Sequence, residues 1–232
     1  MCAVLLGVPP VVWAGGSVRA AVAGVGNVSL ASTVTPATLG LGSGFDDVAT
    51  LTPPQGGARP TGTMSFTVYG PTDPTCAGPI LFDSTNTVSS TPGLSGGFST
   101  TSGSYTPPNV GTYRVISTYS GDANYQRTST GCGDPAQTVT VGLGPTVTAI
   151  SPGAGPAGGA NTVTITGTNL AGATTVDFGG AATPATVLSA TQVAATAPAG
   201  SGTVDVTVTT PFGTSPTGAV DRYTFAPAAG PP

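Results

Sequence analysis

The chain has 232 residues, of which 38% are hydrophobic and 36 are Gly, so it can build one or two domains with buried cores. Only 6% of the residues are charged, the net charge is −4, and the sequence contains no Lys, Glu or His. These absences exclude Ser-His and Cys-His nucleophile pairs, Schiff-base chemistry and imidazole metal ligands, and five scattered Arg residues do not form the cationic surface that nucleic acids require.

The first segment, 1–23, is apolar and ends in Ala21-Val22-Ala23, which resembles a signal-peptidase site. Arg19 follows the apolar run, where a basic residue would be expected to precede it. We interpret the segment as an export signal that begins upstream of Met1; the alternative is a mis-started leader. Pro and Gly interrupt the run, which disfavours a retained membrane helix. We therefore expect a secreted or cell-surface protein with no membrane span in the mature chain.

A first module is predicted over 28–141. Thr, Val and Gly are abundant and several good helix formers are absent, which favours an all-β fold. Short alternating runs are separated by Gly/Pro-rich turns at the spacing of an immunoglobulin-like sandwich. The predicted strands are Val28–Thr35, Val48–Thr52, Thr63–Tyr69, Ile80–Phe82, Phe98–Tyr105, Thr112–Ser120 and Gln137–Val141.

Two segments of this module carry a family resemblance. The first is Gly62–Gly70 (GTMSFTVYG), and the second runs from Gly111-Thr-Tyr113-Arg-Val115 into Tyr119-Ser-Gly-Asp-Ala-Asn124. They are similar to a class of bacterial Ig-like repeats found in secreted and surface proteins. The resemblance implies a β-sandwich with Tyr113 in a structural corner position, where its hydroxyl bonds nearby backbone.

A second module is predicted over 145–226. Val163 and Ile165 alternate with Thr residues, as expected for strands with one buried face, and Val176–Gly179 and Val204–Val208 repeat this alternation. The Ser151-Pro152 turn, Gly158-Gly159, the run TITGTNL at 164–170, VDFG at 176–179 and the closing segment through Phe225 follow the same order as in the IPT/TIG family, which this module resembles. The resemblance implies two tandem immunoglobulin-like β-sandwiches in all, and it implies no particular ligand.

Two Gly/Pro-rich linkers punctuate the chain, at 142–145 between the modules and at 227–232 after the second module. The first is too short to let the modules tumble freely, so we expect two sandwiches in a line with few contacts between them. The second leads to no further strand, from which we expect that the chain is cut from a longer tandem array.

Cys76 and Cys132 are the candidate disulfide, because removal of the leader with Cys2 would leave an even pair in an exported protein. In the chain-entropy model such a bond, closing a loop of about 57 residues, stabilises by roughly 4 kcal/mol. The alternatives are two free thiols in a reducing compartment, or a zinc site with only half of its ligands.

The Asp residues and Phe212 are further candidate sites. The Asp residues show no Asp-x-Asp-x-Asp loop, so turn and solubility roles are favoured over calcium binding, and Ser120–Asn124 has the composition of a tight turn. Phe212 lies in a turn of the second module, where it either binds a partner as an exposed loop-tip aromatic or packs against the module junction. We expect no catalytic residue, no metal and no cofactor.

We therefore predict a non-enzymatic module pair of an exported bacterial surface or secreted protein, which acts as an adhesive, binding or spacer segment. Its partner would be an extracellular protein or polysaccharide. The alternative is an accessory, carbohydrate-associated module of a secreted polysaccharide-degrading enzyme whose catalytic part lies outside this chain.

Overall fold

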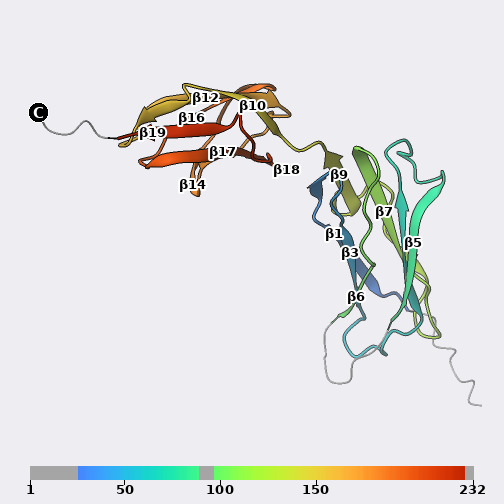
Figure 1. Ribbon diagram of the computed structural model, residues 1–232. Coiled ribbons are helices and arrows are strands. Elements are labelled where there is room, and N and C mark those ends of the chain that lie inside the picture. The colour runs from blue at the N-terminus through green and yellow to red at the C-terminus, as the bar shows by residue number, and fades with distance from the viewer. Residues whose placement is uncertain (1–25, 89–96, 228–232) are drawn as a thin grey trace, which may run out of the picture.

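The chain folds into two consecutive β-sandwiches, as a computed structural model shows for residues 26–88 and 97–227 (Figure 1). The predicted fold class, all-β with two tandem immunoglobulin-like sandwiches, is confirmed. Within these residues the only helix is the single 3-10 turn η1 (Pro135–Gln137), and no helix is long and apolar enough to cross a membrane. The predicted leader at 1–23 and all but the first residue of the tail at 227–232 lie outside the described residues.

The first module consists of two facing sheets. One has the order β1-β3-β6, and the other has the order β2-β9-β7-β4-β5, with β8 paired to β7. The strands are β1 (Ser29–Thr35), β2 (Thr38–Gly40), β3 (Asp46–Thr52), β4 (Thr63–Tyr69), β5 (Ile80–Thr87), β6 (Phe98–Thr101), β7 (Gly111–Tyr119), β8 (Thr128–Ser129) and β9 (Thr138–Gly142).

Each predicted strand of the first module corresponds to one in the structure. Alternation of apolar and hydroxyl residues identified the long strands, because every second side chain enters the core. Phe98–Tyr105 is shorter than predicted: β6 ends at Thr101, and Tyr105 forms an isolated bridge with Phe45. The strands β2 and β8 were not predicted, since segments of two or three residues are too short to show an alternation of apolar and polar residues.

The second module repeats this plan. Its sheets have the orders β10-β12-β16-β15 and β11-β19-β17-β13-β14, with β18 paired to β17. The strands are β10 (Thr146–Ser151), β11 (Ala154–Pro156), β12 (Thr162–Thr168), β13 (Thr175–Phe178), β14 (Ala181–Pro184), β15 (Thr186–Ser189), β16 (Gln192–Thr196), β17 (Gly202–Thr210), β18 (Gly213–Thr214) and β19 (Arg222–Ala226).

A proline divides the opening strand of each module between the two sheets. β1 pairs antiparallel with β3, and after Pro36 the chain continues as β2, which pairs parallel with β9. In the second module β10 pairs with β12, and after Pro152 the chain continues as β11, parallel to β19. Proline has no N–H to continue a ladder, so the chain leaves the first sheet at this point and joins the second.

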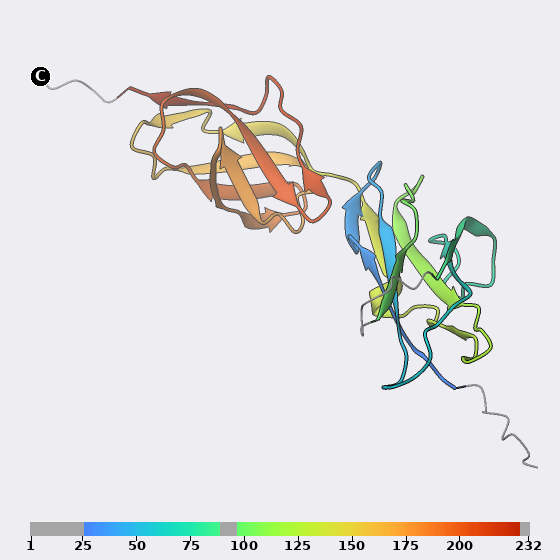
Figure 2. The ribbon, with the colours of Figure 1, turned by 90° about the horizontal axis from the view of Figure 1, so that it is seen from below.

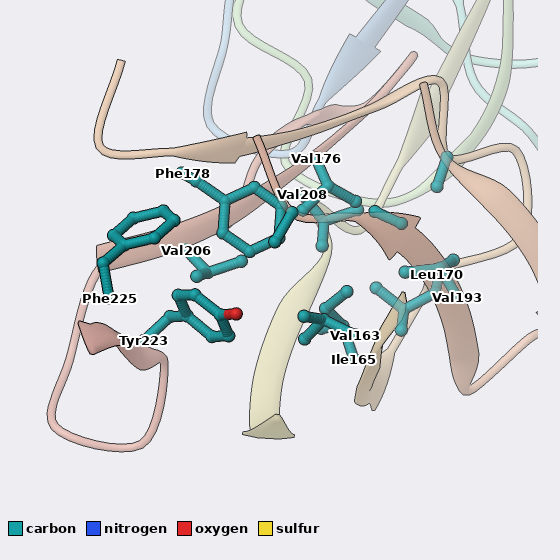
Figure 3. Packing of buried hydrophobic residues seen from close by; sticks show 13 residues of the cluster. Val163, Ile165, Leu170, Val176, Phe178, Val193, Val206, Val208, Tyr223 and Phe225 are labelled. Atoms are coloured by element: carbon teal, nitrogen blue, oxygen red, sulfur yellow. The ribbon is translucent and has the colours of Figure 1, made fainter. Parts of the chain in front are cut away.

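The core of the second module is one continuous apolar cluster (Figure 3). Val163 and Ile165 of β12 face Val206 and Val208 of β17, and both pairs are fully buried. The ring of Tyr223 lies edge-on to Phe178 and to Phe225, with centroid separations of 5.5 and 5.0 Å. Threonines occupy the intervening positions of these strands, which gives each strand its wet face.

The core of the first module is split into two apolar clusters. One gathers around Phe66 and Tyr119, and the other gathers around Val68 and Tyr113. All four side chains lie on the shared ladder of β4 and β7. Between the clusters the inward positions are polar, and Ser117 of β7 is completely buried there.

The two modules do not lie in a line, contrary to the expectation drawn from the linker. Figure 1 shows a marked bend between the long axes of the sandwiches, and Figure 2 shows the same junction from below, at the ends of β9 and β18. The bend follows from contacts at the junction that the linker composition does not encode.

Candidate functional site

The disulfide joins Cys76 to Cys132, the pairing expected from the sequence, with their Cα atoms 5.9 Å apart. Cys76 lies in the loop between β4 and β5, and Cys132 lies just before η1. The bond therefore ties together two loops that no strand pairing connects.

Asp73 organises the loop that carries Cys76. Its carboxylate accepts hydrogen bonds from the backbone N–H groups of Gly78 (2.8 Å), Thr75 and Ala77. The hydrogen bond from Gly78 is the main cause that lowers the pKa of the Asp73 carboxyl. The loop is thus held by its own backbone donors as well as by the disulfide.

Asp122 plays the turn role that its sequence context predicts. Burial alone would raise its pKa, but hydrogen bonds from the backbone N–H groups of Thr61, Asn124 and Tyr125 and from the Thr61 hydroxyl outweigh this and lower it to about 2. These donors leave the carboxylate engaged in local structure. Among the described residues there is no group of three or more acidic or Cys side chains that could hold a metal ion.

Tyr113 forms the corner that the resemblance implied. Its hydroxyl donates to the carbonyl oxygen of Asn109 at 2.9 Å, while the ring is fully buried against the core. The residue thus anchors the turn that leads into β7.

Phe212 lies at the module junction, in the turn between β17 and β18. Its ring covers Gly142 at the end of β9: a Cβ atom added to Gly142 would meet ring atoms of Phe212 at 2.5 Å. A Cβ on Gly40, at the end of β2, would collide with the Phe212 carbonyl oxygen. Glycine is therefore needed at both strand ends for the modules to approach. Of the two sequence interpretations, the structure favours packing at the junction over a free binding loop.

A second contact ties the linker to the second module. The side-chain amide of Asn169, which follows β12, donates to the carbonyl oxygen of Gly144 at 3.0 Å. The linker backbone is thus held from the module that follows it.

Exposed apolar side chains lie beside this junction. Leu41 follows β2, Leu143 follows β9 and Val110 precedes β7, and these strand ends are adjacent in the sheet. Their exposed fractions are 43, 53 and 45%. We call Leu41, Val110 and Leu143 the junction rim; it is the candidate contact surface of the chain.

The Phe and Tyr side chains of the described residues offer no open platform. All seven Phe and six Tyr residues lie in the described part of the chain, and none of them is exposed there. Sugar-binding surfaces commonly stack a ring of the sugar on an exposed aromatic face. The described surface lacks such a face.

One buried polar cluster was not predicted from the sequence; it is made of Ser32, Asp47, Ser117 and Gln137. A signal was present: Asp47 and Ser117 occupy inward positions of strands whose other inward residues are apolar. Only the folded structure brings the four side chains together, because the two most distant members are about a hundred positions apart along the chain.

The family comparison agrees with the motif order in the second module. Residues 145–224 match the model of the IPT/TIG domain. Domains of this family are typically non-catalytic binding modules. A comparison with curated proteins found no similar sequence.

Three solved structures are among those to which the chain is similar. The full extracellular region of plexin A4 has 15% identity and a TM-score of 0.32, with 82% of this chain and 24% of that chain covered. A Bacteroides ovatus mixed-linkage glucan utilisation protein, SGBP-B, solved with a heptasaccharide, has 17% identity and a TM-score of 0.28, covering 82% and 43%. The Escherichia coli adhesin FdeC has 16% identity and a TM-score of 0.37, covering 88% and 66%.

The chain thus spans only a quarter of the plexin chain and less than half of the glucan-utilisation protein, and we draw nothing about its ligand from these similarities. The family match is independent of them, and it covers the second sandwich from β10 into β19. Residues 145–224 match the IPT/TIG family, and in the same chain they follow another immunoglobulin-like sandwich.

Proposed function

We propose that this chain is a non-enzymatic module pair of an exported bacterial surface or secreted protein, which serves as a spacer with an adhesive contact at its junction. The observation that carries the proposal is the packed junction, where Phe212 covers Gly142 and the Asn169 amide holds the linker at Gly144. Because contacts from both modules fix the junction, the second module extends from the first at a fixed angle. Freely jointed modules could not do so.

The composition of the surface supports an extracellular, uncharged role. Exposed threonines pair with each other across strands, as Thr203 does with Thr224 at 2.9 Å and Thr209 with Thr214 at 2.9 Å. With so few charges, attraction to a highly charged partner is weak. The disulfide supports an oxidising compartment, since such bonds persist mainly in exported proteins.

The junction rim is the surface that we assign to partner contact. Leu41, Val110 and Leu143 are apolar and exposed at the same end of the first module. An apolar group of this kind favours a protein partner over a polysaccharide, because the described surface lacks an exposed aromatic face for sugar stacking.

The export claim is tested by brief protease treatment of intact cells of the source organism. We expect peptides from 145–224 to be released before any cytoplasmic marker. Recovery of these peptides only after lysis would refute the surface or secreted location.

The contact claim is tested with beads coated with the full chain and applied to intact host surfaces. The double variant Leu41→Ser/Leu143→Ser should lower bead retention several-fold, whereas Val48→Ser, an exposed apolar residue of β3, should leave it unchanged. Equal retention for both variants would remove the junction rim from the contact. Retention abolished by soluble polysaccharide would favour the carbohydrate-associated alternative.

A further inference from the structure

A cluster of four polar side chains is buried inside the first module. Ser32 of β1, Asp47 of β3, Ser117 of β7 and Gln137 of η1 are exposed by 7, 1, 0 and 0%. They lie between the two apolar clusters, and Ser32, Asp47 and Ser117 occupy positions where the neighbouring inward residues of their strands are apolar. Burying a carboxyl, a carboxamide and two hydroxyls is costly unless each finds partners, so their arrangement calls for a chemical explanation.

The Asp47 carboxylate lies between Ser117 and Gln137. Its Oδ2 accepts a short hydrogen bond from the Ser117 hydroxyl, and its Oδ1 accepts one from Gln137 Nε2 at 3.1 Å. Ser117 Oγ also lies 3.2 Å from Gln137 Oε1. A hydroxyl, a base and a carboxamide therefore meet in a water-excluded site, with the base in contact with both of the others.

Ser32 positions this group. Its hydroxyl lies 2.8 Å from Asp47 Oδ1, 3.0 Å from Ser117 Oγ and 3.3 Å from the Val48 carbonyl oxygen. The backbone N–H of Asp47 is itself held by the Ser102 hydroxyl at 2.8 Å. These contacts fix the carboxylate relative to the hydroxyl that it faces.

We propose that Ser117 and Gln137 are a site of autocatalytic cross-linking, in which the Ser117 hydroxyl replaces the amide nitrogen of Gln137 to form an intramolecular ester. Asp47 takes the proton of Ser117 Oγ while Oγ attacks Gln137 Cδ. The bond from Cδ to Nε2 then breaks, the proton passes from Asp47 to the departing nitrogen, and ammonia leaves. One C–O bond forms and one C–N bond breaks, with no change of oxidation state and no co-reactant.

The proximity of the two reacting groups accelerates this step. The reacting groups come from β7 and η1, 20 positions apart, and folding alone holds them in contact. Holding the two groups in this geometry is equivalent to a high effective concentration of the nucleophile, which reaches the order of 10⁵ M or more in well-oriented intramolecular reactions. The cross-link would join β7 to the segment leading into β9, in the same module as the disulfide.

The test is the mass of the purified full chain. We expect a mass lower by one ammonia than the mass calculated from the sequence with its disulfide. The comparison is chain that is kept unfolded in urea from the time of cell lysis. Molecules that had not folded before lysis should keep the calculated mass in urea and should lose ammonia only when they are refolded. A full mass equal to the calculated value in the folded chain would overturn the proposal.

Tryptic mapping locates the bond. Cleavage at Arg places Ser117 in peptide 115–127 and Gln137 in peptide 128–222. After reduction of the disulfide, an ester alone would hold these two peptides together, and hydroxylamine should separate them. Loss of ammonia with the two peptides running separately would also overturn the proposal, because the loss would then have occurred elsewhere.

Variants assign the roles. Ser117→Ala and Asp47→Asn should each keep the full calculated mass, whereas the double variant Cys76→Ser/Cys132→Ser should still lose ammonia. If Ser117→Ala does not fold, the mass and the tryptic map of the unaltered chain still show whether the ester has formed. Loss of ammonia at an undiminished rate in Asp47→Asn would contradict the role of Asp47 as the proton carrier.

Discussion

Single side chains fix the turns of the first module through hydrogen bonds to backbone groups. Tyr113 bonds the carbonyl of Asn109, and Asp122 collects N–H donors from two separate segments of chain. The family resemblance implied the Tyr113 corner, and the local bonds of Asp122 to Asn124 and Tyr125 were predicted from the turn composition, because these partners lie only a few positions away. The bonds from Thr61, which is 61 positions away, were not predicted. The buried contacts of Ser117 were not predictable in this way, since its partners Asp47 of β3 and Gln137 of η1 are 70 and 20 positions away.

Replacing Tyr113 by Phe should lower the free energy of unfolding of the first module by about 1 kcal/mol, since the Asn109 carbonyl loses a partner while the ring stays buried. Urea denaturation of the full chain measures this. Tyr223→Phe is the matched control, because it removes a hydrogen bond to Asn161 in the second module. A change in the stability of the second module caused by Tyr113→Phe would contradict the local role.

Acid should destabilise the first module through Asp122. Its pKa is lowered to about 2 in the folded chain from an ordinary value of 3.8, so its stabilising effect is complete above about pH 4. The effect is lost as the pH falls through about 2. We expect Asp122→Asn to flatten the decline of thermal stability between pH 4 and 2, measured by circular dichroism. An unchanged slope in the variant would show that other carboxyl groups dominate.

At the scale of elements, alternation located the long strands and failed for the short ones. Thr63–Tyr69 was predicted with the bounds that β4 has, because seven residues give three inward and four outward positions. The strands β2 and β8 have no such period, and their pairing with β9 and β7 depends on where the proline and the preceding turn deliver the chain. The long strands could therefore be predicted from the sequence, whereas the parallel pairing of β2 with β9 could not.

The disulfide acts between elements, and its removal should affect one module only. The double variant Cys76→Ala/Cys132→Ala should lower the unfolding free energy of the first module by about 2–4 kcal/mol, because the unfolded chain regains the freedom of the closed loop. Calorimetry of the full chain should then show an earlier first transition and an unmoved transition for 145–226. A shift of both transitions by the same amount would mean that the modules unfold together.

At the scale of the whole molecule, the bend is the property that sequence reasoning missed. The sequence predicts a linker at 142–145, in which Gly142 is the last residue of β9, but the Gly and Pro content of this segment says nothing about the direction of the second module. The direction depends on Phe212, about 70 positions farther along the chain, which meets glycines at the ends of two strands of the first module. A contact of this kind is visible only once both modules are folded.

Phe212→Ala should loosen the junction. Spin labels at two exposed positions, Thr52 of the first module and Thr186 of the second, should give a narrow distance distribution in the parent chain and a broader one in the variant. Leu188→Ala, which removes an exposed apolar side chain from β15, is the control and should leave the distribution narrow. A broad distribution in the parent would show that Phe212 does not fix the bend.

The proline that divides each opening strand has a mechanical consequence. It places β2 parallel to β9, and β11 parallel to β19, so that the segment after the proline lies beside the last strand of the same module. When the chain is pulled from its two ends, such parallel strands slide in opposite directions along their common ladder. The hydrogen bonds between them, among them Thr140 N–H to Ala37 O and Leu41 N–H to Gly142 O, are then loaded together in shear, where a hairpin pulled apart would lose them one at a time. Each sandwich therefore resists tension through the parallel pair that joins the segment after its proline to its last strand.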